Sequence, residues 1–155
     1  MDLRHLIDIN SVVFSLKANS KKQVLQDLVS EAVKGIDKID SQDVFNHVIR
    51  RERLGSTGMG DGVAIPHASI PGLQGLRCVF SVLARPVAYD SMDDIDVDLV
   101  FLLLAPQTSG ADHLKALAGV SRFFRNSGIC SQIRAAKSAQ AIYSLLLSDR
   151  SSFAA

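Results

Sequence analysis

The sequence has little of what several classes of protein require. It contains no tryptophan and only 6% aromatic residues, and its formal net charge is +1. A domain that neutralises many phosphates is usually strongly basic, and a domain that stacks single-stranded bases needs aromatic side chains. We therefore expect no nucleic-acid partner.

Long apolar runs are also missing. The longest, Leu99 to Ala105, has seven residues, whereas a membrane-spanning helix needs about 18 or more. The N-terminal segment MDLRHLIDIN lacks the apolar stretch of a signal peptide. Two cysteines, Cys78 and Cys130, lie far apart without a C-x-x-C pattern, which favours buried free thiols in a reducing compartment over a disulfide. We expect a cytoplasmic protein with no membrane-inserted segment.

A chain of 155 residues, 47% of them hydrophobic, is long enough to build its own core without a disulfide or a metal. No linker, repeat or low-complexity segment divides it. We therefore expect a single domain over residues 1–155, with a frayed tail at 150–155.

Apolar periodicity predicts alternating helices and strands. Asn19 or Ser20 can cap a first helix, and Ser138 can cap a last one. Helices are predicted after residue 20, from about 41 to 53, from about 110 to 125, after residue 128 and after residue 138. Strands are predicted over 63–65, 76–84 and 97–105. The last of these is apolar throughout, which is typical of a central strand covered on both faces. Because some connections are too short for a crossover helix, we expect an α/β fold with a mixed, mostly parallel sheet flanked by helices on both faces.

Three local expectations follow from the same patterns. The segment GSTGMGDG at 55–62 has four glycines in eight residues and is predicted to be irregular. The pair Arg85-Pro86 is predicted to interrupt a strand. In the helix at 110–125, one face is predicted to carry Leu114, Leu117, Ala118, Ser121 and Phe124.

The glycine-rich loop is the first candidate site. Backbone amides from Gly55 through Ser56 and Thr57 to Gly58 can bind an anion. A P-loop would need a G-x-x-x-x-G-K-[ST] motif followed by a helix, and a dinucleotide site would need G-x-G-x-x-G after a strand. Neither context is present, because a helix precedes this loop and a strand follows it. Taken alone, such a loop is more often a mobile turn than an anion site.

Three side chains could supply chemistry beside this loop. His67 follows Ile65-Pro66, whose restricted backbone presents an imidazole in the fixed direction that a nucleophile needs. His113 falls in the first turn of a predicted helix, where free amides favour negative charge. Arg51, just before the loop, can bind a phosphate in a bidentate way. Each alone could be an ordinary surface residue, but their combination with the loop favours a functional site.

No metal-binding pattern is complete. The alternating aspartates of segment 94–98 resemble the start of a calcium loop, but Leu99 and Ala105 stand where glycine and glutamate are required. His67 and His113 have no partner at zinc-binding spacing. We therefore expect no metal, and the chemistry considered below requires no cofactor.

The motif residues form one continuous pattern, Arg51-Glu52, Leu54-Gly55-Ser56-Thr57-Gly58, Gly60, Gly62 and Val63-Ala64-Ile65-Pro66-His67. It resembles the IIA proteins of the phosphoenolpyruvate-dependent phosphotransferase system, in the fructose/mannitol-type superfamily, and their nitrogen-regulatory branch most of all. The run LVFLLLAP at 99–106 and His113-Leu114 also match, so the resemblance covers about the whole chain. Met59 replaces an isoleucine found in many relatives, and Ser69 stands where a basic residue is common.

The resemblance implies that His67 is phosphorylated on a ring nitrogen by a small phosphocarrier protein that itself carries phosphohistidine. It also implies that Arg51 stabilises the phosphoryl group and that His113 contacts this group or the partner. The amides of Gly55–Gly58, with the hydroxyl of Ser56 or Thr57, can surround the phosphoryl oxygens. Proteins of this branch are associated with sensor kinases, potassium transport and nitrogen metabolism, and we expect regulated partners of that kind.

Two alternatives remain open from the sequence. The chain could be a sugar-transport IIA component that passes its phosphoryl group to a permease-linked IIB protein, although the GSTG core favours regulation. It could also be a purely binding regulatory module in which phosphorylation is vestigial.

Overall fold

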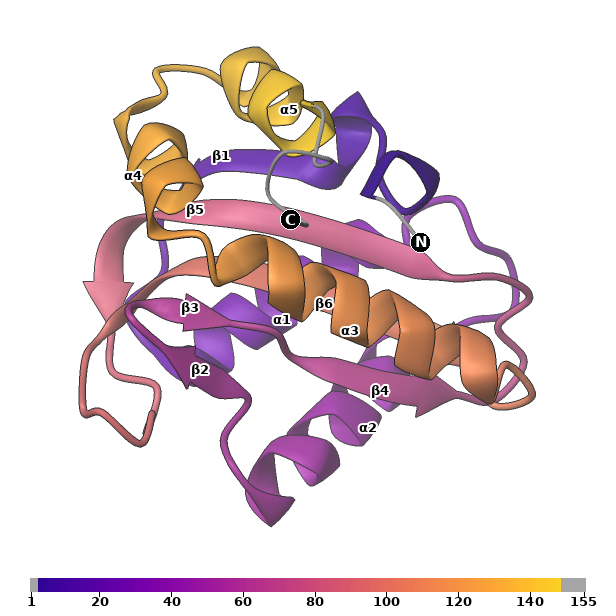
Figure 1. The fold of residues 1–155 in the computed structure, drawn as a ribbon. Helices are drawn as coiled ribbons and strands as arrows, with labels where there is room; N and C mark the ends of the chain where they lie inside the picture. The colour runs from indigo at the N-terminus through magenta and orange to yellow at the C-terminus, as the bar shows by residue number, and fades with distance from the viewer. Residues whose placement is uncertain (1–2, 149–155) are drawn as a thin grey trace.

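A computed structural model describes residues 3–148 of the chain, and the tail predicted at 150–155 lies outside them. A mixed sheet lies between two helical layers (Figure 1). The α-helices are α1 (Lys21–Ala32), α2 (Ser41–Leu54), α3 (Ala111–Phe124), α4 (Ser127–Ala135) and α5 (Ala139–Leu147). The strands are β1 (Val12–Leu16), β2 (Gly58–Gly60), β3 (Val63–Ala64), β4 (His67–Ile70), β5 (Arg77–Val87) and β6 (Val97–Pro106), and two 3-10 helices, η1 (Leu3–His5) and η2 (Ile9–Ser11), precede β1.

The sheet has the order β1-β5-β6-β3-β2, and β4 pairs with β6 beyond the end of β3. The pairs β1–β5, β3–β6 and β4–β6 are parallel, while β5–β6 and β2–β3 are antiparallel. The sheet is therefore mixed and mostly parallel, as the sequence predicts.

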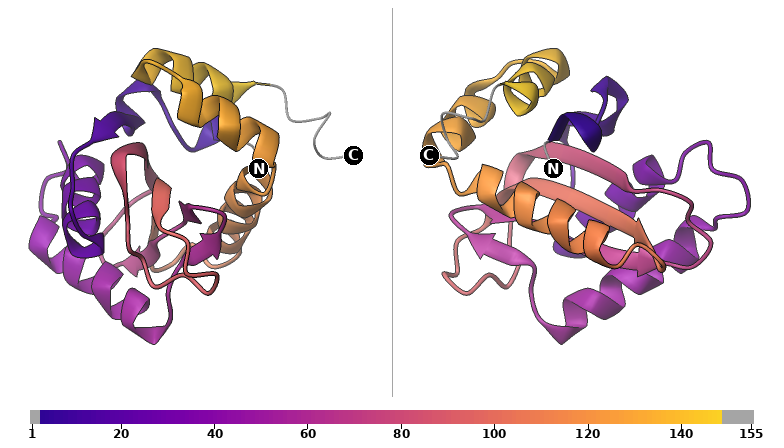
Figure 2. Two further views of the ribbon diagram at one scale, coloured as in Figure 1. Left: turned by 90° about the vertical axis from the view of Figure 1, so that its left-hand side faces the viewer. Right: turned by 45° about the vertical axis from the view of Figure 1, so that its right-hand side comes forward.

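Strand β6 separates two hydrophobic cores. Val100, Leu102 and Leu104 join the core formed with α1 and α2, whereas the alternate side chains, Leu99, Phe101 and Leu103, join the core formed with α3, α4 and α5. Figure 2 shows the two helical layers on opposite sides of the sheet. All six side chains are fully buried, which confirms the prediction of a central strand covered on both faces.

Side-chain caps begin most of the helices. Ser20 accepts a hydrogen bond from the Gln23 amide at the start of α1, and Ser138 does the same for α5, as predicted. Asp40 and Asn126 cap α2 and α4 in the same way. Each cap gives an acceptor to an amide that has no partner within its helix.

Two predicted interruptions of regular structure are wrong. Part of the glycine-rich segment forms β2, which pairs with β3 because Gly60 and Gly62 turn the chain at positive φ. Strand β5 continues through Arg85-Pro86 to Val87, with a shift of register against β6 between Val82 and Val87. A proline is tolerated where such an irregularity removes the need for its hydrogen bond.

The face predicted on α3 is only partly right, because Phe124 is buried and Leu117 packs against the core, but Leu114 and Ala118 are exposed. Leu114 is 69% exposed, and the fully buried side chains of this helix include Ala116 and Val120. Phe123 and Phe124 complete the stripe that packs against the sheet. The addition of Phe123 to the buried stripe rotates this face away from Leu114, because an aromatic ring buries more area than an aliphatic side chain.

The cysteines agree with the expectation from composition. Cys78 and Cys130 are buried free thiols. Between residues 3 and 148, no helix is long and apolar enough to cross a membrane, and no group of three or more potential ligands is placed to hold a metal. Asp98 is half-buried and receives hydrogen bonds from Arg134 on α4, which gives it a structural role.

Candidate functional site

His67 lies where the sheet changes from one short strand to another. β3 and β4 run along the same side of β6, and Pro66 separates them. The amide of Leu103 donates to the Pro66 carbonyl at 2.9 Å, and the amide of Ile65 donates to the Thr57 carbonyl at 3.1 Å. His67 therefore lies just past the end of β3, as predicted, and is also the first residue of β4, which the sequence did not predict.

The imidazole of His67 has one nitrogen committed to the backbone. Its Nδ1 lies 2.8 Å from the Ile65 carbonyl oxygen, so Nδ1 carries the proton and donates it. Burial lowers the pKa of His67 below 6.5, and the positive charge of Arg51 and the neighbouring His113 lower it further, against the opposing effects of the Ile65 hydrogen bond and Glu52. The ring is therefore mostly neutral near pH 7, with a lone pair on Nε2.

His113 comes from the first turn of α3 and meets His67 from one face of the sheet. The two ring centroids are 5.8 Å apart, with the planes at 72°. Burial lowers the pKa of His113, and its Nε2 is buried with no hydrogen-bond partner among the described residues. Buried polar atoms without a partner are uncommon and often mark functional positions.

Arg51 approaches from the opposite helical layer, at the end of α2. Its Nη1 donates to the Gly55 carbonyl at 2.8 Å, and its charge acts on His67 strongly enough to lower that pKa. Three side chains that the sequence singled out thus converge from α2, β4 and α3. Their arrangement offers a neutral nucleophile, a fixed positive charge and a second imidazole in one place.

The glycine-rich loop is less open to an anion than predicted. The amides of Gly55 and Thr57 donate to Glu52, one to its carbonyl and one to its carboxylate. The Gly58 amide donates to Ser56 Oγ, which itself donates to the Tyr89 carbonyl. These donors are already used inside the protein, so their role in binding a phosphoryl group stays a prediction.

Sequence reasoning missed Glu52, the most buried charge of the region. The side chain of Glu52 is 4% exposed and lies 3.0 Å from Lys21 Nζ. Its carboxylate accepts from the hydroxyls of Thr57 and Tyr89, and the carboxylate and burial together raise the pKa of Tyr89 well above 10. A signal was present, because Glu52 follows Val48 by four residues on the buried stripe of α2.

Gly58 is required by close packing. A Cβ at this position would collide with the hydroxyl of Ser91, which is 4% exposed. The network around Glu52 and this contact hold the loop against the segment that follows β5. The loop is therefore tied to the rest of the fold by several contacts, and its Gly55 carbonyl accepts a hydrogen bond from Arg51.

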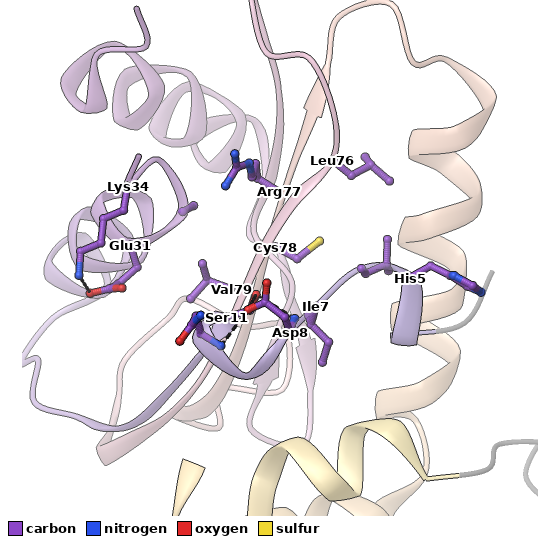
Figure 3. A pocket seen from close by; sticks show the side chains of 13 residues that line it. His5, Ile7, Asp8, Ser11, Glu31, Lys34, Leu76, Arg77, Cys78 and Val79 are labelled. Carbon is purple, nitrogen blue, oxygen red and sulfur yellow. Dashed lines mark hydrogen bonds and ion pairs between the residues drawn. The ribbon is translucent and has the colours of Figure 1, made fainter. Parts of the chain in front are cut away.

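A separate cavity of about 710 Å³ lies on another part of the molecule, between η2, the end of α1 and the start of β5 (Figure 3). Its charged side chains are largely engaged, since Glu31 pairs with Lys34 at 2.7 Å and Asp8 caps η2. The thiol of Cys78 lines it, and burial raises the pKa of this thiol to about 12. None of the candidate site residues lines this cavity.

Comparisons with known proteins identify the family of this chain. Residues 5–149 match the family described as phosphoenolpyruvate-dependent sugar phosphotransferase system, EIIA 2. The chain is 46% identical over 146 residues to a nitrogen regulatory protein of Bradyrhizobium diazoefficiens, covering 94% of this chain and 95% of that one. A nitrogen regulatory protein of Pseudomonas aeruginosa is 30% identical, with 94% of each chain covered.

Solved structures agree with this assignment. Nitrogen regulatory protein IIA-Ntr from Neisseria meningitidis superimposes with a TM-score of 0.86 at 29% identity, over 92% of this chain and 97% of that one. The mannitol IIA of Escherichia coli shares the fold, with a TM-score of 0.75 at 17% identity over 90% of this chain and 98% of that one. This chain therefore belongs to the EIIA 2 family of the phosphoenolpyruvate-dependent phosphotransferase system and, within it, to the nitrogen-regulatory branch.

Proposed function

We propose that this protein is a phosphoryl carrier that accepts a phosphoryl group on Nε2 of His67 from a phosphohistidine phosphocarrier protein. In this proposal its phosphorylation state then regulates protein partners in the cytoplasm, of the kind linked to nitrogen and potassium metabolism. One observation carries the proposal. The Nδ1 proton of His67 is held by the Ile65 carbonyl, which leaves Nε2 as the nitrogen with a lone pair.

The proposed step is an exchange between two imidazoles. His67 Nε2 forms a bond to phosphorus while the phosphorus–nitrogen bond of the donor breaks, and the donor imidazole leaves with that electron pair. The proton on His67 Nδ1 stays in place toward Ile65. Catalysis of such a transfer requires alignment and stabilisation of charge on the equatorial oxygens.

Arg51 and His113 are the groups best placed to stabilise that charge. Arg51 acts electrostatically on His67, and a guanidinium binds phosphoryl oxygens through a planar pair of donors. His113 lies against the ring of His67, and its Nε2 has no partner among the described residues. A phosphoryl oxygen would supply that partner. The amides of Gly55, Thr57 and Gly58 would join only after exchanging the acceptors that they have in this structure.

The test is incubation of the purified protein with phosphoenolpyruvate and the upstream transfer proteins of the system. Acid-labile phosphate should appear on the wild-type chain and be absent from His67→Ala. His47→Ala is a matched control, because His47 lies on α2 and its ring contacts the Asp43 carbonyl outside the site. Equal labelling of wild type and His67→Ala would contradict the proposal.

A sugar-transport role is the second candidate. The description of the matching family names a sugar phosphotransferase system. In addition, a complex of the mannitol IIA with its phosphorylated IIB is among the structures that share this fold, with a TM-score of 0.74. Rapid transfer from the phosphorylated chain to a sugar-specific IIB protein would favour this candidate. The names of the more similar relatives favour regulation.

A third measurement distinguishes the proposed function from a purely binding role. A regulatory partner captured by the wild-type chain would bind His67→Ala and His67→Asp equally well if phosphorylation were vestigial. Under our proposal, the enzymatically phosphorylated protein and the unmodified protein differ in their affinity for that partner, because phosphorylation adds up to about two negative charges at the site.

A further inference from the structure

A groove with a basic rim lies between the start of α1 and the length of α2, outside the candidate phosphoryl site. It encloses about 710 Å³, and the two helices lie side by side on one face of the sheet (Figure 2). The α2 residues that line it lie three or four positions apart, as on one face of a helix. They are Gln42, Phe45, Asn46, Ile49, Arg50 and Arg53, and Glu52 also reaches the groove.

The groove has more positive charge than its own carboxylates neutralise. Lys21 pairs with Glu52 at 3.0 Å and lies 3.9 Å from Asp90, the other acidic residue of the lining. The remaining cations of the lining, Lys22, Arg50 and Arg53, form no ion pair with any residue from 3 to 148. Three cations on one open rim form an attractive surface for carboxylates.

The floor of the groove is apolar. Phe45 and Ile49 lie at its base; Phe45 is 7% exposed, and Ile49 is partly buried against the same core. The side-chain amide of Gln42 donates a hydrogen bond to the amide oxygen of Asn46 at 3.0 Å. Both side chains line the groove, and this hydrogen bond uses one donor and one acceptor that a ligand could otherwise bind. A ligand that carried only charge would leave this floor exposed to water.

We infer that this groove binds an acidic amphipathic segment of a protein partner. Its apolar side chains would lie on Phe45 and Ile49, and its carboxylates would meet Arg50, Arg53 and Lys22. A helix with one apolar and one acidic side has this complementarity, because its anchors repeat at the spacing that an elongated groove accepts. The inference concerns the unphosphorylated chain and does not depend on phosphoryl transfer at His67.

The groove is also connected to the candidate site. Glu52 lines the groove, accepts hydrogen bonds from Thr57 in the glycine-rich loop and acts electrostatically on His67. Arg50 and Arg53 flank Arg51 on the same turn of α2. A partner that occupies the groove therefore lies beside the support of the candidate nucleophile.

The test uses the full chain and a fluorescent helical peptide with glutamates along one side and leucines along the other. Fluorescence anisotropy should show saturable binding that weakens about tenfold or more when Arg50 and Arg53 are both replaced by glutamate, because close charge pairs across an interface become repulsive. The matched control replaces Arg77 and Arg122 by glutamate, which changes the net charge equally at exposed positions outside the groove. This control should keep the wild-type affinity, and circular dichroism confirms that both variants are folded.

Two further probes separate the amphipathic segment from other anions. A peptide in which serines replace the leucines should bind about tenfold more weakly, since the apolar contacts are lost. Guanosine triphosphate and inorganic polyphosphate should not displace the leucine-containing peptide at equal charge concentration. Three outcomes would each overturn the inference. They are equal affinity of the two double variants for the peptide, equal affinity of the chain for the leucine and serine peptides, and displacement of the leucine peptide by guanosine triphosphate.

Discussion

At the scale of single residues, the reactivity of His67 depends on a few atoms around its ring. The Ile65 carbonyl holds the proton on Nδ1, and burial together with Arg51 keeps the ring neutral. The same imidazole in an exposed loop would exchange its proton between both nitrogens and titrate near its ordinary value. In the proposed mechanism, His67 is thus neutral, with its proton on Nδ1, before the phosphoryl donor binds.

Arg51→Gln should raise the pKa of His67, because it removes a positive charge that disfavours the imidazolium. It should also slow phosphoryl acceptance by roughly 10- to 100-fold, since a charged hydrogen bond is worth about 1.5–3 kcal/mol. Nuclear magnetic resonance titration of the ring and transfer kinetics measure the two effects. Arg51→Lys should keep the low pKa but still slow the transfer, because lysine lacks the planar pair of donors.

The rate of phosphoryl acceptance should fall at acid pH. Because the pKa of His67 is lowered from 6.5 in the folded protein, the neutral nucleophile persists below pH 6.5 and is lost only as the pH falls through the lowered value. A pH profile of the transfer rate, with the donor kept fully phosphorylated, should therefore have its midpoint below 6.5. A midpoint above 6.5 would contradict the burial of the ring.

At the scale of elements, α2 and the glycine-rich loop are joined by a buried polar network. Glu52 binds the amide and hydroxyl of Thr57 and the hydroxyl of Tyr89, and Lys21 of α1 supplies the opposite charge. A buried carboxylate is tolerated only with such partners, and removal of one partner leaves a desolvated charge. This network explains why Glu52 faces inward within an otherwise basic helix end.

Thr57→Val should lower the free energy of unfolding by about 1–3 kcal/mol, because it leaves the carboxylate of Glu52 without one buried donor while it keeps the size of the side chain. Urea denaturation measures this loss. The matched control is Thr108→Val in the exposed turn after β6, which should change the stability by less than about 0.5 kcal/mol. Equal effects of the two substitutions would show that the network contributes nothing.

The orientation of α3 can be tested by a pair of substitutions. Val120→Ala should lower the free energy of unfolding by about 2 kcal/mol, because Val120 is fully buried against the sheet and its loss leaves a cavity. Leu114→Ala removes a side chain that is 69% exposed and should cost less than about 0.5 kcal/mol. The reverse order would support the face that the sequence predicted.

At the scale of the whole molecule, the two thiols report on the integrity of one core. Cys78 on β5 and Cys130 on α4 are both part of the core between the sheet and α3–α5, and burial raises the pKa of both thiols. The native protein should react only slowly with a thiol reagent such as Ellman's reagent, because the thiolate is the reactive form. In denaturant both thiols should react rapidly, and a stopped-flow assay distinguishes the two conditions.

Sequence patterns predicted correctly the features that depend on residues close together in the chain. The apolar run of β6 and the caps at Ser20 and Ser138 each depend on nearby residues, and each was predicted correctly. The buried face of α3 and the pairing of β2 depend on which distant segment lies opposite. A helix with apolar residues on more than one side can be rotated by its partners, and a glycine segment becomes a strand only when another strand offers its hydrogen bonds.

The sequence by itself determined the family, the α/β class and the three side chains of the candidate site, because these follow from a contiguous motif and from local periodicity. The tertiary structure alone decided that Arg51, His67 and His113 converge from α2, β4 and α3. Strand β4 pairs with β6, and α2 and α3 pack against the sheet from opposite sides. The tertiary structure also decided that Glu52 is buried, that the amides of Gly55, Thr57 and Gly58 already have acceptors, and that Nδ1 of His67 is bound to the Ile65 carbonyl. Each of these depends on atoms whose partners lie elsewhere in the chain or on the exact direction of a side chain, which spacing in the sequence does not specify.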